Sequence, residues 1–214
     1  MLAKATCVSL HTLALVLSIR PPASSTNKEK ADKVKDEGLF TTIMINIMPH
    51  FGQSAAVVAT AVYILMMFRG HISGELKPWQ AFATVSGVLG YLLRAWSFRT
   101  LDRFFTYSLT IRPNHRLVQN GPYRYLLHPS YTALMLTGFP YIFSLAYQGY
   151  WTYLIKPYML VPVPGSLLAV IGLIISYGLC YFRVQGEEKM LLQHFGAEWK
   201  QHASTRWRFI PFVV

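Results

Sequence analysis

Two stretches of this sequence combine residue types that could do chemistry. The first runs from His115 to Tyr131 and is basic, aromatic and punctuated by glycine and proline. It ends in His128-Pro129, where a long hydrophobic segment begins. Proline is favourable in the first turn of a helix, because its missing N–H would have no partner there. We therefore expect His128 at the start of a membrane-facing helix, whose positive end suits a carboxylate or another anion.

The second stretch, from Arg183 to His202, supplies acidic side chains. It is predicted to begin as a helix that continues from the last hydrophobic segment, so Arg183 and Glu187 share one face. This pair is either a weak ion pair on the helix surface or a cationic and anionic site at the mouth of the membrane, and the spacing by itself favours the ion pair. Glu188 falls in the neighbouring apolar stripe. Either it is buried with a partner, or Gly186 distorts the helix there.

The composition favours a membrane protein. Of the 214 residues, 53% are hydrophobic and 14% are charged, whereas a soluble domain usually carries about 25% charged residues. The net charge of +11 comes from basic residues spread over the connectors between apolar segments. It indicates cytoplasmic loops, and no nucleic-acid motif is present. The histidines are scattered and the two cysteines lie in apolar runs, so neither a metal site nor a disulfide framework is predicted.

The elements that must position these residues are apolar segments long enough to span a membrane. They predict an all-α, polytopic bundle of about five transmembrane helices. The first could instead be a cleaved signal, but Arg20-Pro21-Pro22 is a poor cleavage site, which favours a retained helix. Residues 20–38 are expected to form a solvated, flexible loop. The predicted spans are residues 1–19, 43–68, 79–98, 129–147 and 161–182.

Within the third predicted span, Gly87 and Gly90 are small enough for a neighbouring helix to approach closely. Arg94 lies one turn from the end of that span, and snorkelling to the headgroups is favoured over a functional role. Basic residues are concentrated in the connector 99–127 and in the tail from 183, whereas the connector 148–160 has only Lys156. The positive-inside rule then places the central connector and the tail in the cytoplasm, and five spans give a lumenal N-terminus.

No GxGxxG, GxxxxGK[ST] or GxSxG pattern occurs, so a Rossmann site, a P-loop and a nucleophile-elbow hydrolase are not indicated. The sequence HRLVQNGPYRYLLHPSYT, followed by RVQGEEKMLLQHFGAEW and then RFIP, resembles the isoprenylcysteine carboxyl methyltransferase family. The resemblance covers roughly the C-terminal half of the chain. Its two motifs come in the family's order and at a similar separation.

The resemblance implies a multi-pass enzyme of the endoplasmic reticulum membrane with its active site facing the cytosol. It would use S-adenosylmethionine to methylate the free C-terminal carboxylate of a prenylated cysteine in CaaX-type proteins. Residues 1–78 would then be N-terminal membrane helices and a cytosolic loop. Residues 79–214 would form the catalytic core, in which three membrane helices, the connector 99–128 and the cytosolic tail 183–214 combine, and the tail helix completes the cofactor site.

The resemblance also assigns roles to residues. Arg183 would hold the substrate carboxylate, Glu187 would close the cofactor site from the tail, and these two form the predicted catalytic pair. Two positions depart from the family pattern: Ala133 stands where glycine is frequent, and Leu127 stands where an arginine is usual. The residues expected to contact S-adenosylmethionine, besides Glu187, are His115, Arg116, Leu117, Val118, Tyr123, His128, Pro129, Ser130 and Tyr131.

These residue types suit methyl transfer to a carboxylate. The acceptor is already ionised near neutral pH, so no general base is required and positioning dominates. An arginine fork fixes a carboxylate through two hydrogen bonds. Two alternatives stay open at this point. One is a membrane methyltransferase acting on a lipid amine, and the other is a non-catalytic membrane scaffold whose motifs cap and anchor helices.

Overall fold

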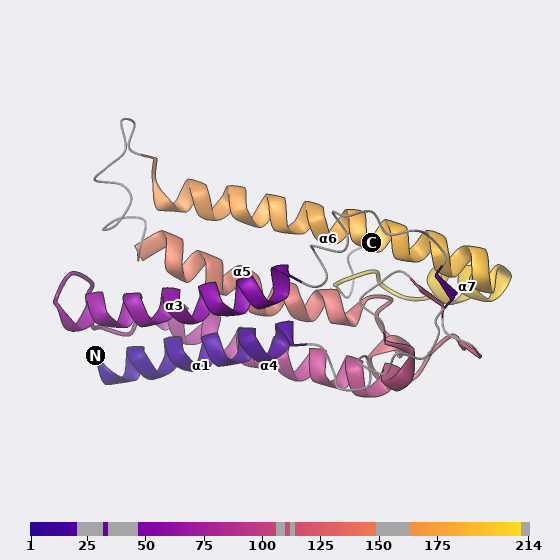
Figure 1. Cartoon of the computed structure of the whole chain (residues 1–214), viewed down its shortest axis with the longest axis horizontal. Coiled ribbons are helices and arrows are strands. Elements are labelled where there is room, and N and C mark those ends of the chain that lie inside the picture. The colour runs from indigo at the N-terminus through magenta and orange to yellow at the C-terminus, as the bar shows by residue number, and fades with distance from the viewer. Residues whose placement is uncertain (21–31, 34–46, 106–109, 112–113, 149–162, 211–214) are drawn as a thin grey trace.

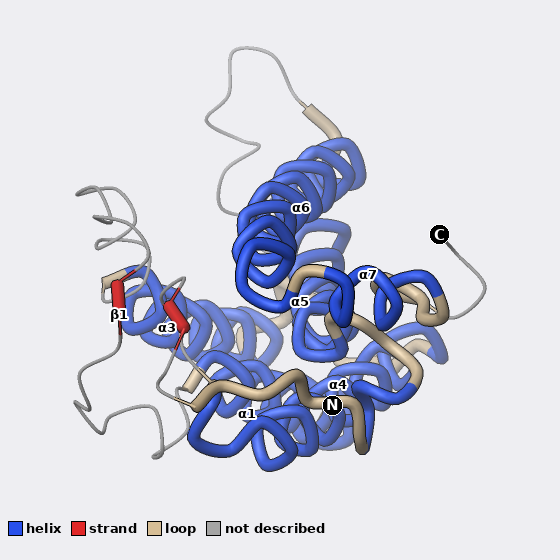
Figure 2. Tube along the Cα trace, turned by 90° about the vertical axis from the view of Figure 1, so that its right-hand side faces the viewer, coloured by secondary structure: helices blue, strands red, loops and turns tan. Residues whose placement is uncertain are grey.

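Long helices running side by side make up most of this protein. The computed structural model describes residues 1–20, 32–33, 47–105, 110–111, 114–148 and 163–210. The helices lie along the long axis of the molecule (Figure 1), and the view along the bundle shows α5 between α6 and the group formed by α1, α3 and α4 (Figure 2). The long helices are α1 (Leu2–Ile19), α3 (Met48–Phe68), α4 (Pro78–Leu101), α5 (Pro129–Gln148) and α6 (Gly165–Phe195).

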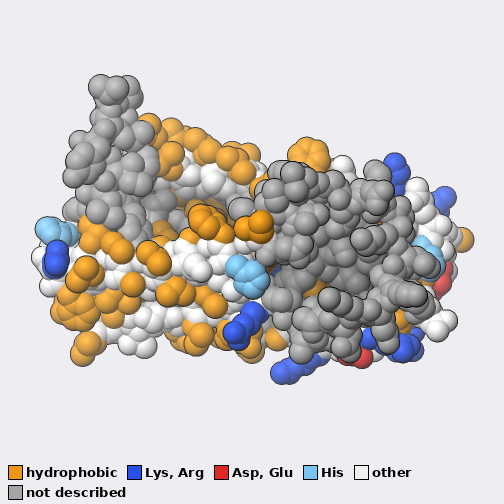
Figure 3. All heavy atoms as spheres, viewed as in Figure 1, with side chains coloured by type: hydrophobic (Ala, Val, Ile, Leu, Met, Phe, Trp, Pro, Cys, Tyr) orange, Lys and Arg blue, Asp and Glu red, His pale blue; other side chains and the backbone are white. Residues whose placement is uncertain are grey.

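These helices confirm the predicted helical membrane bundle. The helices α1, α3 and α6 are each long and apolar enough to cross a membrane. On the face drawn in Figure 3, hydrophobic side chains cover much of the visible helix surface, and the visible acidic side chains lie in the right-hand half. The helices α4 and α5 run beside these three and hold buried polar side chains. In α4 and α5 these are Gln80, Thr84, Arg94, Ser97, Thr132 and Thr137.

Short elements gather where α4 and α6 end and α5 begins, at the right in Figure 1. They are the 3-10 helices η2 (Asp102–Phe104) and η3 (Gly121–Arg124), the helix α7 (Ala197–Ser204), and the strands β1 (Asp32–Lys33) and β2 (Thr110–Ile111). The two strands pair antiparallel, and within the described part of the chain they are the only strands. Most of the predicted loop 20–38 and of the connector 148–160 lies outside the described residues.

The helix α6 is longer than a bilayer is thick. Its 31 residues extend about 46 Å at about 1.5 Å per residue, whereas the hydrocarbon core measures about 30 Å. One end of α6 therefore projects beyond the apolar layer. The helix continues without a break through Gly186 to Phe195, so the prediction that the tail begins as a helix continuing from the last span is correct.

Two glycines of α4 let other helices approach closely, as predicted. A Cβ atom on Gly87 would lie 2.6 Å from Nε2 of His11 in α1. A Cβ atom on Gly90 would lie 2.7 Å from the carbonyl oxygen of Ala133 in α5 and would also collide with Oγ1 of Thr137. Small residues at such crossings are typical of helix packing in membranes.

Polar side chains of the bundle interior bond to one another across these contacts. The hydroxyl oxygens of Thr12 and Thr60 are 2.6 Å apart, and Thr60 is 2.9 Å from the hydroxyl of Tyr141. Tyr141 in turn donates to the carbonyl oxygen of Ala56 at 2.8 Å. This chain of hydrogen bonds links α1, α3 and α5. It satisfies polar groups that would otherwise be costly to bury in an apolar layer.

We expect Gly90→Ala to destabilise the protein by about 1–3 kcal/mol, because the added methyl group meets backbone atoms of α5 as well as the buried Thr137 hydroxyl. Gly138→Ala is the matched control. Nothing lies within 4 Å of a Cβ atom built on Gly138, and alanine is the better helix former. Thermal unfolding in detergent measures both variants. Equal melting temperatures for the two would contradict the proposed close approach of α4 and α5.

Arg94 does not snorkel, and that interpretation is wrong. The residue is only 4% exposed. Its Nη1 atom donates to the carbonyl oxygen of Ser130 at 3.0 Å and to the Ser130 hydroxyl at 2.6 Å. Its Nε atom donates to the carbonyl oxygen of Ser18 at 2.5 Å. Partners supplied by α1 and α5 therefore hold the guanidinium inside the bundle.

Candidate functional site

The central connector and the C-terminal segment meet, as predicted from their shared side of the membrane. The N–H of Leu127 donates to the carbonyl oxygen of Trp207 at 2.8 Å, and the N–H of His128 donates to that of Arg208 at 3.1 Å. Leu126 and Trp207 form a parallel β-bridge. The C-terminal segment thus lies along the connector just before α5 begins.

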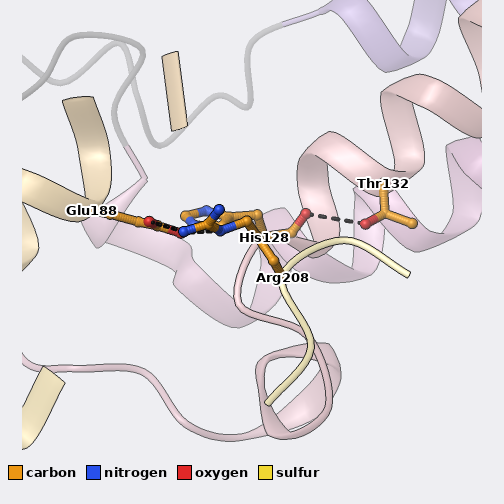
Figure 4. A network of polar contacts seen from close by, with 4 residues as sticks. All are labelled: His128, Thr132, Glu188 and Arg208. Atoms are coloured by element: carbon orange, nitrogen blue, oxygen red, sulfur yellow. Dashed lines mark hydrogen bonds and ion pairs between the residues drawn. The ribbon is translucent and has the colours of Figure 1, made fainter. Parts of the chain in front are cut away.

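Glu188 of α6 binds to both sides of this junction, through His128 and Arg208. The Nε2 atom of His128 donates to Oε1 of Glu188 at 3.0 Å. Arg208 donates two hydrogen bonds to the same carboxylate, from Nε to Oε1 at 2.9 Å and from Nη2 to Oε2 at 2.8 Å (Figure 4). His128 also holds the first turn of α5, because its carbonyl oxygen accepts a hydrogen bond from Thr132. Of the two interpretations left open for Glu188, the one with a partner is therefore correct, although the side chain is only partly buried. The group of His128, Glu188 and Arg208 is called the Glu188 clamp below.

The Glu188 clamp favours the ionised carboxylate. Partial burial by itself raises the pKa of Glu188, but the hydrogen bonds and charges of His128 and Arg208 outweigh burial and hold the pKa below its ordinary value. A carboxyl whose folded-state pKa is depressed contributes stability above its unfolded pKa and loses it as the pH falls through the folded value. The clamp should therefore loosen in acid.

His202 of α7 is packed against the same junction. It is 3% exposed, and its ring lies 5.8 Å from that of Trp199, which is itself 6.5 Å from the ring of His128. The buried Nδ1 atom of His202 has no hydrogen-bond partner. Burial, and to a smaller extent the positive charges of Arg206 and His128, lower the pKa of His202 from 6.5 to about 4. The imidazole is therefore neutral at physiological pH.

We expect the melting temperature to fall as the pH is lowered from 6.5 toward 4. In that window the unfolded chain protonates His202 at its ordinary value of 6.5, while the folded protein resists protonation down to about 4. The unfolded state then binds more protons, so stability decreases with decreasing pH. His202→Gln should flatten this part of the profile. The same substitution at His194, which is exposed on α6, serves as the control, and an unchanged slope in His202→Gln would contradict the assignment.

A second cluster lies where α5 and α6 face each other. The hydroxyl of Tyr131 accepts a hydrogen bond from Arg183 and donates one to Glu187. The carboxylate of Glu187 is also close enough to Tyr123 for its charge to act on that hydroxyl, which is hydrogen-bonded to Ser97. Burial raises the pKa of Tyr123, and the charge of Glu187 raises it further. Tyr123 is therefore a neutral hydrogen-bonding group. These four residues (Tyr123, Tyr131, Arg183 and Glu187) are called the Arg183 cluster below.

The Arg183 cluster matters because its charged members engage another helix. An isolated ion pair on the surface of α6 would not involve Tyr131 of α5. Instead, a cation, a carboxylate, the buried phenol of Tyr123 and the partly buried phenol of Tyr131 converge between α5 and α6. Such a group can hold a ligand that carries both positive and negative charges, because it offers a matching partner for each.

The other predicted site residues fall into two groups. His128 belongs to the Glu188 clamp, and Pro129 is fully buried at the start of α5. Further out, the ring of His115 lies 4.8 Å from that of Phe104 and 5.7 Å from that of Phe195, beside the end of α6. Its neighbours in the predicted site, Arg116, Leu117 and Val118, are exposed or partly buried.

Neither Arg94 nor Arg208 was among the predicted site residues, although both contact one of them. The side chain of Arg94 contacts Ser130, and the carbonyl oxygen of Arg208 accepts a hydrogen bond from the N–H of His128. A signal existed for Arg208, because it opens the RFIP motif that carries part of the resemblance. For Arg94 the signal was its place within an apolar span, where an ionisable residue is unusual.

Several known proteins have sequences similar to that of this chain. "Protein-S-isoprenylcysteine O-methyltransferase" of Dictyostelium discoideum is 23% identical over 174 residues, which cover 80% of this chain and 65% of that protein. "Protein-S-isoprenylcysteine O-methyltransferase B" of Arabidopsis thaliana is 27% identical over 128 residues, covering 59% of this chain and 56% of the relative. Form A of the same plant is 25% identical over 134 residues, covering 62% and 59%.

This chain therefore spans between 56% and 65% of the length of these relatives. The sequence model of the isoprenylcysteine carboxyl methyltransferase family matches residues 83–193, just over half of the chain. The matched range runs from α4 through the connector and α5 into the projecting part of α6, and so includes the Arg183 cluster and two of the three clamp residues. The chain belongs to the isoprenylcysteine carboxyl methyltransferase family.

Proposed function

We propose that this protein transfers a methyl group from S-adenosylmethionine to the C-terminal carboxylate of a prenylated cysteine. The observation that carries the proposal is the Arg183 cluster. In a chain of this family, Tyr131 joins an arginine and a glutamate at the end of a membrane helix. The names of the relatives, which specify isoprenylcysteine, point to the same acceptor.

The residues present fit the proposed cofactor. S-adenosylmethionine carries an ammonium group, a carboxylate and ribose hydroxyls, and when bound it supplies an electrophilic methyl group on a positively charged sulfur. Glu187 offers a carboxylate for the ammonium or the ribose, and Tyr123 and Tyr131 add hydroxyls. Ser130 stands at the start of α5, where the helix dipole favours a carboxylate. The remaining residues assigned to the cofactor are His115, Arg116, Leu117, Val118, His128 and Pro129.

Arg183 would hold the acceptor. Its planar guanidinium can bind both oxygens of a carboxylate and fix their direction. Since the carboxylate is ionised at neutral pH, the protein needs no general base and contributes mainly alignment, which can be worth about 7–11 kcal/mol. Within the cluster, Tyr131 steadies Arg183 from the neighbouring helix. Arg183 and Glu187 are accordingly the proposed catalytic pair, one for the substrate and one for the cofactor.

The position of the site suits a lipidated substrate. A prenyl chain gains about 0.8 kcal/mol per CH₂ buried in lipid, so it remains among apolar helices while the cofactor enters from water. We place the site at the cytosolic face of the endoplasmic reticulum membrane, with five spans and a lumenal N-terminus, because the basic residues follow the positive-inside rule. The partners would be CaaX-type proteins ending in a free prenylcysteine.

One assay tests the proposal. Purified protein is given S-adenosylmethionine with a labelled methyl group and N-acetyl-farnesylcysteine, and labelled methyl ester is measured. Transfer to this acceptor supports the proposal. Transfer only to an amine lipid would replace it with the lipid methyltransferase alternative. If no methyl transfer occurs and S-adenosylmethionine does not stabilise the protein against heat, the alternative of a non-catalytic scaffold is supported.

Glu187→Ala is expected to weaken the binding of S-adenosylmethionine by roughly tenfold to a hundredfold, because a hydrogen bond to a charged group contributes about 1.5–3 kcal/mol. Isothermal titration in detergent measures the dissociation constant. Glu198→Ala, an exposed glutamate of α7, is the control. If Glu187→Ala binds the cofactor as tightly as the wild type, its assigned role is wrong.

A further inference from the structure

Arg94 contacts Ser130, a residue of the proposed cofactor site, although Arg94 itself has no role in that site so far. It reaches from α4 to the first turn of α5, where Nη1 donates to both the hydroxyl and the carbonyl oxygen of Ser130. Its Nε atom is taken by the carbonyl oxygen of Ser18, so the guanidinium is held from two sides. The residue is 4% exposed. An arginine fixed in this way has one orientation available to it.

The hydrogen bond to Ser130 sets the direction of the serine hydroxyl. A guanidinium can only donate, so the Ser130 oxygen must accept from Arg94 at 2.6 Å. The proton of the Ser130 hydroxyl is then directed away from Arg94 and is left to donate to another acceptor. A hydrogen bond from a charged donor also makes that hydroxyl a better donor in its turn.

The same side chain acts on other members of the site. Its charge is close enough to influence the hydroxyl of Tyr123, and that hydroxyl is bonded to Ser97, one turn further along α4. The cytosolic end of α4 thus contacts two residues of the proposed cofactor site, Ser130 through Arg94 and Tyr123 through Ser97. A positive charge in a region of low dielectric acts over a longer distance than it would in water.

We propose that Arg94 is a positioning residue of the methyl-donor site, which holds the Ser130 hydroxyl so that it donates to an oxygen atom of the bound cofactor. This inference rests on the proposed function. A purely structural role, in which Arg94 only ties α1, α4 and α5 together, would affect stability. It would leave the affinity of folded protein for the cofactor unchanged.

The test is a double-mutant cycle with Arg94→Lys, Ser130→Ala and the variant that carries both. Lysine keeps the positive charge, but a single ammonium group lacks the guanidinium fork that reaches Ser18 and Ser130 together. For each variant, the melting temperature and the dissociation constant of S-adenosylmethionine are measured on full-length protein in detergent. Thr84→Val is the matched control, since Thr84 is a buried hydroxyl near the other end of α4.

We expect Arg94→Lys and Ser130→Ala each to raise the dissociation constant about tenfold, the loss expected for one hydrogen bond. The double variant should be no weaker than either single variant, because both remove the same interaction. The KM for N-acetyl-farnesylcysteine should not change, and Thr84→Val should alter the melting temperature at most. An unchanged dissociation constant in folded Arg94→Lys, or additive effects in the double variant, would overturn the proposal.

If Arg94→Lys does not fold, the variants Ser130→Ala and Ser130→Thr test the inference in its place. The first removes the hydroxyl through which Arg94 acts, and the second retains it. Wild-type affinity in Ser130→Ala overturns the inference, and loss of affinity in that variant alone supports it. Wild-type protein that fails to bind S-adenosylmethionine at all would instead refute the proposed function.

Discussion

Arg183→Ala should lower kcat/KM for a prenylcysteine acceptor by roughly a hundredfold, while S-adenosylmethionine still binds. Removing one partner of a desolvated, hydrogen-bonded charge pair costs about 2–5 kcal/mol, and about 1.4 kcal/mol corresponds to a tenfold change in rate. The cost is expected in the acceptor step because, in the proposed function, Arg183 binds the acceptor carboxylate and Glu187 binds the cofactor. Steady-state kinetics with N-acetyl-farnesylcysteine measures the loss, and thermal stabilisation by S-adenosylmethionine checks that the cofactor site survives.

Two further variants sharpen this experiment. Arg183→Lys retains the charge and loses the fork, so its activity should fall between those of the wild type and Arg183→Ala. Lys189→Ala removes an exposed cation from the same helix and should behave as the wild type. Prenylcysteine turnover by Arg183→Ala at the wild-type rate would show that the acceptor carboxylate is bound elsewhere.

Glu188→Ala should destabilise the folded protein by on the order of 2 kcal/mol. Breaking a fully buried ion pair costs about 3–5 kcal/mol, and the smaller figure applies because the Arg208 side chain is 36% exposed and recovers part of its hydration. The loss should also free the C-terminal segment from the start of α5, since Glu188 holds Arg208 and His128 together. A lower melting temperature and faster amide exchange in residues 206–210 are the expected readouts.

Glu198→Ala provides the comparison for the Glu188 clamp. Its carboxylate is exposed and its hydrogen bond to Gln119 is long, at 3.5 Å, so removing it should change the melting temperature little. As the pH falls below 4.5, the ordinary pKa of a glutamate, the difference between wild type and Glu188→Ala should shrink, because protonation of Glu188 weakens the clamp in the wild type as well. A difference that is independent of pH would mean that the carboxylate charge does not contribute.

Much of the fold could be predicted from local sequence. The apolar runs that begin at Trp79, Pro129 and near Pro164 correspond to α4, α5 and α6, because spanning length and hydrophobicity are properties of a continuous segment. Gly87 and Gly90 marked the close helix contact, since only small residues allow it. The number of spans stays a prediction, because α4 and α5 carry buried polar residues and their apolar character alone does not show that they cross a membrane.

The roles of the site residues stay a prediction, and the contacts between these residues could not be predicted from the sequence. Arg183 and Glu187 lie on one face of α6 by helical periodicity alone, whereas the hydroxyl between them comes from Tyr131, on another helix. Arg94 was interpreted as a snorkelling residue because its distance from the end of the span allowed that. The choice depended on which way α4 is turned about its axis, and the hydrogen bonds to Ser18 and Ser130 show that it faces inward.

Sequence by itself determined the helical membrane class and, through motifs that resemble the family, the family, because composition, periodicity and short motifs are local properties of the chain. Tertiary structure alone decided the partners of Glu188, one of which is 60 residues earlier in the chain and the other 20 residues later. The physical reason is that a carboxylate in an apolar stripe must find compensating donors. Which donors it finds is set by the packing of α5, α6 and the C-terminal segment, and no local pattern encodes that packing.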